Sequence, residues 1–207
     1  MSEPHRPRGA GSGLAAAKLA LRDQIVTARN RLAVSELGAA GTAITGHLFA
    51  EPEVRRAATV AAYVSTGTEP GTGVLLDALV EAGKRVILPA LLPDDDLDWA
   101  TYQGEASLLP ARRGILEPVG PRLGVEAVAA ADVVLVPGLA VSSKGVRLGR
   151  GGGSYDRALA RVPVGTFTCV LLHDGEVGRE VPAEKHDRSV SAAATPSGVI
   201  RFGRGAT

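Results

Sequence analysis

The chain has 207 residues, of which 45% are apolar and 22% charged, a composition typical of a globular protein with a continuous core. Its net charge of +1 lacks the basic excess of dedicated nucleic-acid-binding domains, so we expect no nucleic-acid partner. A single cysteine excludes a framework of intramolecular disulfides. The sequence contains no apolar run of about eighteen residues, so we expect no membrane partner.

The first thirteen residues differ in composition from the rest of the chain. They are rich in proline, glycine and arginine, and they lack the apolar segment of a secretory signal. We therefore expect residues 1–13 to form a disordered lead-in, residues 14–207 to form a single domain, and the protein to be cytoplasmic.

A first amphipathic helix is expected over residues 14–34. Apolar residues recur there at steps of seven, four, three and four, namely at Leu14, Leu21, Ile25, Ala28 and Leu32. At roughly 100° per residue, Lys18, Arg22 and Arg29 fall within about 40° of one another along the border of the apolar face. These cations either form a solvated flank of the helix or reach a partly buried anion.

Buried strands and helices alternate along the remaining sequence. Strands are expected over residues 57–65, 85–89, 132–137 and 164–172, helices over 35–52, 72–83 and 125–131, and an extra hairpin arm over 97–102. This alternation predicts a three-layer α/β/α single domain with a mainly parallel sheet. Ligands of such folds bind beyond the carboxyl ends of the strands, which is where we expect the site.

A glycine-rich loop follows the strand over 132–137 and precedes a helix that begins at Ser154. Glycines lack the Cβ atoms that keep backbone N–H groups away from an anion, and the first N–H groups of the following helix point toward the loop. Lys144, Arg147 and Arg150 add positive charge. The loop is therefore predicted to hold a phosphate. A flexible surface linker is the alternative, but linkers are rarely flanked by a strand and a helix in this way.

The loop also resembles a known family. The run Gly145-x-Arg147-Leu148-Gly149-x-Gly151-Gly152-Gly153-x-Tyr155-Asp156-Arg157 is similar to the signature of the 5-formyltetrahydrofolate cyclo-ligases, also called 5,10-methenyltetrahydrofolate synthetases. It fits neither a Walker A loop nor a dinucleotide-binding turn. Lys18-x-x-Leu21-Arg22 resembles the N-terminal motif of the same family, in which the lysine and the arginine contact ATP.

The resemblance implies an enzyme that uses ATP to cyclise 5-formyltetrahydrofolate to 5,10-methenyltetrahydrofolate, with release of ADP and phosphate. It implies that Glu69 and Tyr155 orient the folate, that Arg147 and Tyr155 are catalytic, and that Asp156 and Asp187 hold Mg²⁺. The residues expected at ATP are Lys18, Arg22, Gly145, Arg147, Leu148, Gly149, Arg150, Gly151, Gly152 and Gly153. The substrate would be free or polyglutamylated, and we expect a monomer.

Several features leave other interpretations open. Glu69 is also suited to the start of a helix, where an acid is stabilised by the helix dipole, and Asp187 to a turn. The chain has Val141 and Ser142 where the family commonly has Phe-Asp, and Ser154 where it commonly has an aromatic residue. The alternatives are a sugar-phosphate isomerase-like enzyme, which would use the loop for one phosphate, and a non-catalytic nucleotide sensor with a closed folate pocket.

Overall fold

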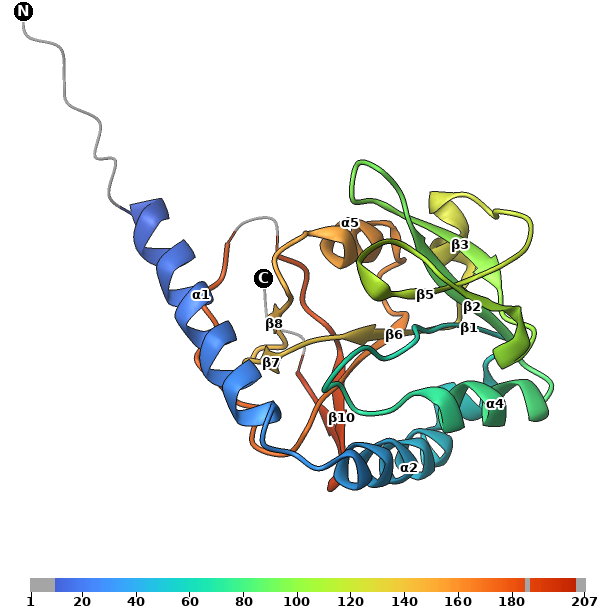
Figure 1. The fold of residues 1–207 in the computed structure, drawn as a ribbon, viewed down its shortest axis with the longest axis horizontal. Helices are drawn as coiled ribbons and strands as arrows, with labels where there is room; N and C mark the ends of the chain where they lie inside the picture. The colour runs from blue at the N-terminus through green and yellow to red at the C-terminus, as the bar shows by residue number, and fades with distance from the viewer. Residues whose placement is uncertain (1–9, 185–186, 204–207) are drawn as a thin grey trace, which may run out of the picture.

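The computed structural model describes residues 10–184 and 187–203, and a seven-stranded sheet forms its centre (Figure 1). The strand order is β11-β10-β9-β6-β1-β2-β3, and neighbouring strands from β10 to β2 run parallel. The edge strands β3 and β11 are antiparallel to their neighbours. The strands are β1 (Thr59–Ala61), β2 (Arg85–Leu91), β3 (Leu97–Thr101), β6 (Val133–Pro137), β9 (Phe167–Leu171), β10 (Ala192–Thr195) and β11 (Gly198–Arg201). The predicted mainly parallel sheet is confirmed.

Helices cover both faces of this sheet, as the three-layer prediction requires. α2 (Val34–Ala50), α3 (Pro52–Arg56) and α4 (Gly73–Glu81) bury residues such as Leu48 and Leu76 against one face. α5 (Ser154–Arg161) and the 3-10 helix η3 (Val125–Ala130) pack on the other face, with Leu159 and Val128 in the second core. Figure 1 shows α2 and α4 on the side of the sheet opposite α5.

The extra hairpin arm predicted over residues 97–102 is present, and it extends the main sheet at its edge. Here β3 pairs with β2, and Trp99 lies opposite Pro89 with only 1% of its surface exposed. The bulk of this indole favours the core over a solvated arm. A second hairpin follows, in which β4 (Leu108–Pro110) pairs with β5 (Leu116–Pro118). The 3-10 turns η1 (Glu105–Ser107) and η2 (Arg112–Gly114) lie on either side of β4.

The first helix, α1 (Ala10–Arg29), lies at the side of the domain, next to the hairpin of β7 (Ala140–Val141) and β8 (Arg147–Leu148) (Figure 1). It begins at Ala10, before the predicted start at residue 14, and it ends at Arg29, before the predicted end at residue 34. Residues 10–13 of the predicted disordered lead-in are helical, because a helix extends through poor helix formers once its first turns exist. Residues 1–9 lie outside the described part of the chain.

A buried ion pair fastens the end of α1 to the domain. Arg29 is 1% exposed, and its Nε and Nη2 atoms donate to the two carboxylate oxygens of Glu176, each at 2.7 Å. Arg29 Nη2 also donates to the carbonyl of Gly138 at 2.9 Å, while the backbone N–H of His173 donates to Glu176. Arg29 and Glu176 are separated by 147 positions in the sequence, and their contact fixes the direction of α1.

Within the described residues, no helix combines the length and the apolar character that crossing a membrane would demand.

Candidate active site

A cavity of about 290 Å³ lies beyond the carboxyl ends of the central strands. Pro137 at the end of β6, Tyr63 and Val64 after β1, and Leu91 at the end of β2 all line it. This is the sheet edge at which the sequence predicted a ligand site. The glycine-rich loop and the Glu69 turn, which were expected at the same edge, meet in this cavity.

Residues 149–153 form one wall of the cavity, and the local geometry favours glycine at Gly149, Gly151 and Gly153. A Cβ atom on Gly149 would lie 2.7 Å from Nη1 of Arg147. Gly151 and Gly153 have φ angles of 107° and 70°, which side chains disfavour. Gly153 is the residue that precedes α5, so the loop directs the N-terminus of this eight-residue helix toward the cavity. Exposed N–H groups at such a helix start favour an anion.

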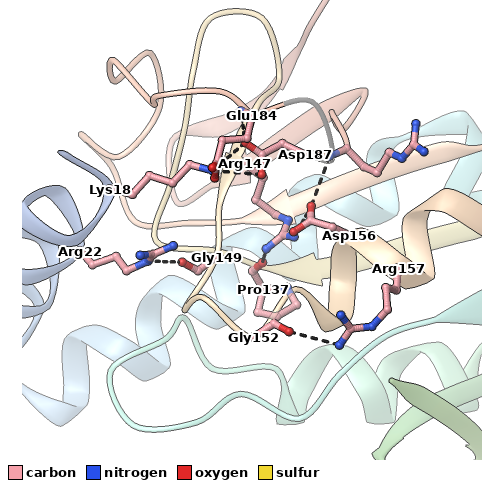
Figure 2. A network of polar contacts seen from close by, with 11 residues as sticks. Lys18, Arg22, Pro137, Arg147, Gly149, Gly152, Asp156, Arg157, Glu184 and Asp187 are labelled. Carbon is pink, nitrogen blue, oxygen red and sulfur yellow. Dashed lines mark hydrogen bonds and ion pairs between the residues drawn. The ribbon is translucent and has the colours of Figure 1, made fainter. Parts of the chain in front are cut away.

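Two cations of α1 reach this wall (Figure 2). Arg22 donates from Nε to the carbonyl of Gly149 at 2.8 Å. Lys18 is 7% exposed, and its ammonium contacts Glu184 at 2.6 Å and Asp187 at 2.8 Å. Burial by itself would lower the pKa of Lys18, but the hydrogen bonds to Asp187 and Glu184 outweigh it and raise this pKa. Lys18 therefore stays charged next to partly buried acids and does not belong to a solvated flank.

Arg147 forms the floor of the same region. It is 5% exposed, contacts Asp156 at 3.2 Å, and places its guanidinium carbon 5.8 Å from the ring centre of Tyr155. Its Nη1 donates to the carbonyl of Pro137 at 3.3 Å. Its buried Nε has no hydrogen-bond partner within the described part of the chain, which leaves donor capacity in the floor of the cavity.

The predicted metal-binding acids, Asp156 and Asp187, both line the cavity, and each is already paired with a cation. Asp156 accepts hydrogen bonds from Arg147 and from the backbone N–H of Arg188 at 3.2 Å, and Asp187 accepts from Lys18 (Figure 2). Across residues 10–184 and 187–203 there is no group of three or more acids, histidines or cysteines placed to hold a metal by itself. A cation at these two acids would complete its shell with water or with oxygens of a bound molecule.

The opposite part of the lining is apolar and contains a buried acid. Glu69 is 6% exposed, accepts the N–H of Thr66 at 2.8 Å, and pairs with Arg150 at 3.1 Å. Desolvation and, secondarily, the charge of Glu69 raise the pKa of Tyr155, so its hydroxyl remains a neutral donor. The apolar side chains of this part are Val64, Pro89, Leu91, Leu97, Ile115 and Leu116.

The structure brings together all the predicted site residues except Gly145. Gly145 lies outside the cavity lining, in the turn between β7 and β8, where its φ is 78° and a Cβ atom would lie 2.4 Å from the carbonyl oxygen of Val190. This positive φ and this close packing explain why position 145 is a glycine. Of the three departures from the family pattern, Ser154 lines the cavity, whereas Val141 and Ser142 do not.

Two lining acids were not predicted from the sequence. Glu184 contacts Lys18, and Glu117 on β5 accepts the N–H of Leu91 at 2.9 Å. Both belong to irregular segments without hydrophobic periodicity, so no local pattern marked them. The hairpin that carries Glu117 also supplies Ile115 and Leu116 to the apolar part of the lining.

Comparison with known proteins gives a consistent result. The model of the 5-formyltetrahydrofolate cyclo-ligase family matches residues 14–196. The 5-formyltetrahydrofolate cyclo-ligase of Mycolicibacterium smegmatis is 43% identical over 67% of this chain and 73% of its own length. That of Escherichia coli K12 is 36% identical over 72% of this chain and 83% of its own length.

A solved structure agrees with these matches. The 5,10-methenyltetrahydrofolate synthetase of Aquifex aeolicus superposes with a TM-score of 0.75 and 28% identity, covering 92% of this chain and 95% of that one. The family match spans α1, the glycine-rich loop and the Glu69 turn, which are the segments that build the cavity. The chain belongs to the 5-formyltetrahydrofolate cyclo-ligase family.

Proposed function

We propose that this protein catalyses the ATP-dependent cyclisation of 5-formyltetrahydrofolate to 5,10-methenyltetrahydrofolate, releasing ADP and phosphate. The observation that carries this proposal is one cavity whose lining combines two kinds of chemistry. A cationic wall with exposed backbone N–H groups suits a polyphosphate, and an apolar wall with a buried acid suits a flat ring that has hydrogen-bond donors. A reaction that joins a nucleotide and a folate needs both.

The cationic wall fits ATP. Lys18, Arg22 and Arg147 line it from α1 and β8, and the glycine backbone leaves room for phosphate oxygens. When bound, ATP supplies the phosphoryl group that turns the formyl oxygen into a leaving group, so that N10 can close the ring. Arg147, buried next to Asp156 and the carbonyl of Pro137, would neutralise charge on that group.

Asp156 and Asp187 would hold Mg²⁺ in this proposal. Magnesium in phosphate sites usually takes one or two carboxylates and completes its shell with phosphate oxygens and water. Both acids line the cationic part of the cavity, so they fit a metal that arrives together with the nucleotide. Their present cations, Arg147 and Lys18, would then be released toward the phosphates.

Glu69 and Tyr155 would orient the folate. The Glu69 carboxylate can accept the adjacent N–H donors of a pterin ring in a paired geometry. Tyr155 lines the same cavity, and its neutral hydroxyl can donate to the substrate. None of these roles requires a covalent bond between the protein and the substrate.

A direct assay tests the proposal. The protein is mixed with 5-formyltetrahydrofolate, ATP and Mg²⁺, and the absorbance of the methenyl product is followed together with ADP. Both signals should grow at equal rates, and growth of neither would refute the proposal. The comparisons lend no support to a sugar-phosphate isomerase or to a non-catalytic sensor. Monomeric state, cytoplasmic location and use of polyglutamylated substrate remain predictions.

A further inference from the structure

The carboxylate that is proposed to receive the folate already has a partner on each oxygen. Oε2 of Glu69 accepts the backbone N–H of Thr66 at 2.8 Å. Oε1 accepts Nε and Nη2 of Arg150 at 3.2 and 3.1 Å. The Thr66 hydroxyl also contacts Oε2 at 3.4 Å, so these donors together occupy the acceptor positions of the carboxylate. A pterin that offers two adjacent donors to it must therefore displace one of these partners.

Arg150 is the partner that is able to leave. Thr66 and Glu69 are locked to each other, since the N–H of Glu69 also donates to the carbonyl of Thr66 at 3.2 Å. The side chain of Arg150 is 56% exposed, whereas that of Glu69 is 6% exposed. Separating such a partly solvated pair costs little, and water can solvate the released guanidinium. The acid stays in place, and the arginine moves.

The same arginine stands on the loop that would hold the phosphates. It lies between Gly149 and Gly151, and its side chain lines the cavity. A guanidinium binds phosphate oxygens through paired charge-assisted hydrogen bonds, and a phosphate carries more negative charge than one carboxylate. A nucleotide in the cationic part would thus compete with Glu69 for Arg150.

We propose that Arg150 exchanges Glu69 for a phosphate of ATP, so that nucleotide binding frees the folate-binding acid. This inference rests on the proposed function. Its consequence is positive coupling, in which each ligand raises the affinity for the other by the same factor. The exchange also disfavours folate binding before ATP is present.

Calorimetric titration tests this exchange. The dissociation constant of 5-formyltetrahydrofolate is measured with and without Mg²⁺ and AMP-PNP, an ATP analogue that does not transfer its phosphate. For the wild type, the analogue should tighten folate binding by about five- to a hundredfold. Arg150→Ala should bind folate about fivefold more tightly than wild type in the absence of nucleotide, and should lose most of the coupling.

Arg157→Ala is the matched control. Arg157 is an exposed cation of the same segment, but its guanidinium donates to the carbonyls of Asp95 and Gly152 and points away from the Lys18 cluster (Figure 2). In the absence of nucleotide, the Arg157→Ala variant should bind folate with the same affinity as the wild type. Glu69→Gln should weaken folate binding, and adding Arg150→Ala to it should bring no gain, because the gain requires the carboxylate.

Whether Arg150→Ala strengthens or weakens nucleotide-free folate binding decides whether the exchange occurs. If Arg150 simply held the folate or the fold, its removal would weaken nucleotide-free folate binding or leave it unchanged, and either result overturns the exchange. A wild type that makes methenyl product while showing no coupling would overturn the exchange and leave the proposed function standing. A wild type that neither binds folate nor makes product would refute both.

Discussion

Each acid proposed to bind the metal is neutralised by a cation that is proposed to bind ATP. Lys18 contacts Asp187 and Glu184, and Arg147 contacts Asp156. Charges so little exposed need partners, because an isolated buried charge is very costly. Incoming Mg²⁺ and phosphate would bring charges of both signs, so these partners could be exchanged without leaving any group unpaired.

Asp156→Asn tests the metal assignment. The amide keeps the shape of the side chain but removes the charge that would hold the cation, so turnover should fall by about a hundredfold or more, approaching the effect of chelating Mg²⁺. The measurement is product absorbance as a function of Mg²⁺ concentration. The control is Asp174→Asn, which should behave like the wild type. Asp174 is an exposed acid that accepts a hydrogen bond from Ser197. Undiminished turnover in Asp156→Asn would place the metal elsewhere.

At the scale of elements, α1 brings two of the cations, Lys18 and Arg22, to a site whose other residues come from strands, from the loops that follow them and from the start of α5. Its charged border could be predicted from helical spacing, because Lys18 and Arg22 recur along one side of the apolar stripe. The partners of these two cations could not be predicted in this way. Glu184, Asp187 and the Gly149 carbonyl are far away in the sequence, and no local pattern specifies which loop will face a helix.

Substitution of Arg22 and Lys18 tests whether α1 contributes to ATP binding. Arg22→Ala should lower kcat/KM by about tenfold to a thousandfold, because it removes a charge-assisted contact from a partly desolvated site. Its effect on stability should be about 1 kcal/mol, since its partner is a single carbonyl. Lys18→Ala should show a similar kinetic loss with a larger destabilisation, about 1–3 kcal/mol, because Asp187 loses its buried partner.

Arg31→Ala is the control for these two variants. Arg31 lies beyond the end of α1, in an exposed turn. It should match the wild type in ATP affinity, turnover and thermal stability. Equal behaviour of all three variants would show that the cations of α1 do not serve the site.

The Arg29–Glu176 pair makes a prediction about how α1 is attached. Arg29→Met should destabilise the protein by about 3–5 kcal/mol, because it leaves Glu176 charged and buried without its cation. Adding Glu176→Met should recover most of that loss, since an apolar pair of similar volume replaces the buried charges. Urea unfolding of the single and double variants measures both effects. No recovery in the double variant would mean that the pair acts through more than charge burial.

One central strand was missed for a physical reason. β10 consists of Ala192, Ala193, Ala194 and Thr195, and alanine has a low intrinsic preference for strands. It is nevertheless completely buried, because β9 and β11 pair with it on either side and small side chains fit between the two packed cores. Only the assembled sheet specifies this strand.

At the scale of the whole molecule, the edge of the sheet contributes a pH dependence. The hydrogen bonds from Arg201 on β11 lower the pKa of Glu53 in α3 from 4.5 to about 2. Because the folded-state pKa lies below the unfolded one, this pair stabilises the fold above about pH 4.5 and loses that effect as the pH falls toward 2. Solvent screening of the half-exposed Arg201 limits the contribution to about 1 kcal/mol.

Urea unfolding between pH 5 and pH 2.5 checks this prediction. The free energy of unfolding of Glu53→Gln should fall less steeply with decreasing pH than that of the wild type. Above pH 5 the variant should be less stable by about 1 kcal/mol. Identical slopes for the two proteins would show that the pair does not form in solution.

The fold class and the glycine-rich loop could be predicted from the sequence, because both leave local signals. Alternating buried strands and helices indicated the layers, and the loop marked the edge of the sheet where the cavity opens. The hairpin of β4 and β5 and the acids Glu117 and Glu184 could not be predicted. They take their positions from contacts between distant segments, which composition and periodicity do not encode.

The pairing of Lys18 with Glu184 and Asp187 affects the order in which the protein folds. These contacts join residues 166 and 169 positions apart, among the widest separations in the chain. Closing so long a loop is entropically slow compared with forming local helices and hairpins. During synthesis, α1 leaves the ribosome early, yet its cations have no acids to meet until nearly the whole chain has followed. We therefore expect the proposed nucleotide site to be completed last, after the sheet has formed.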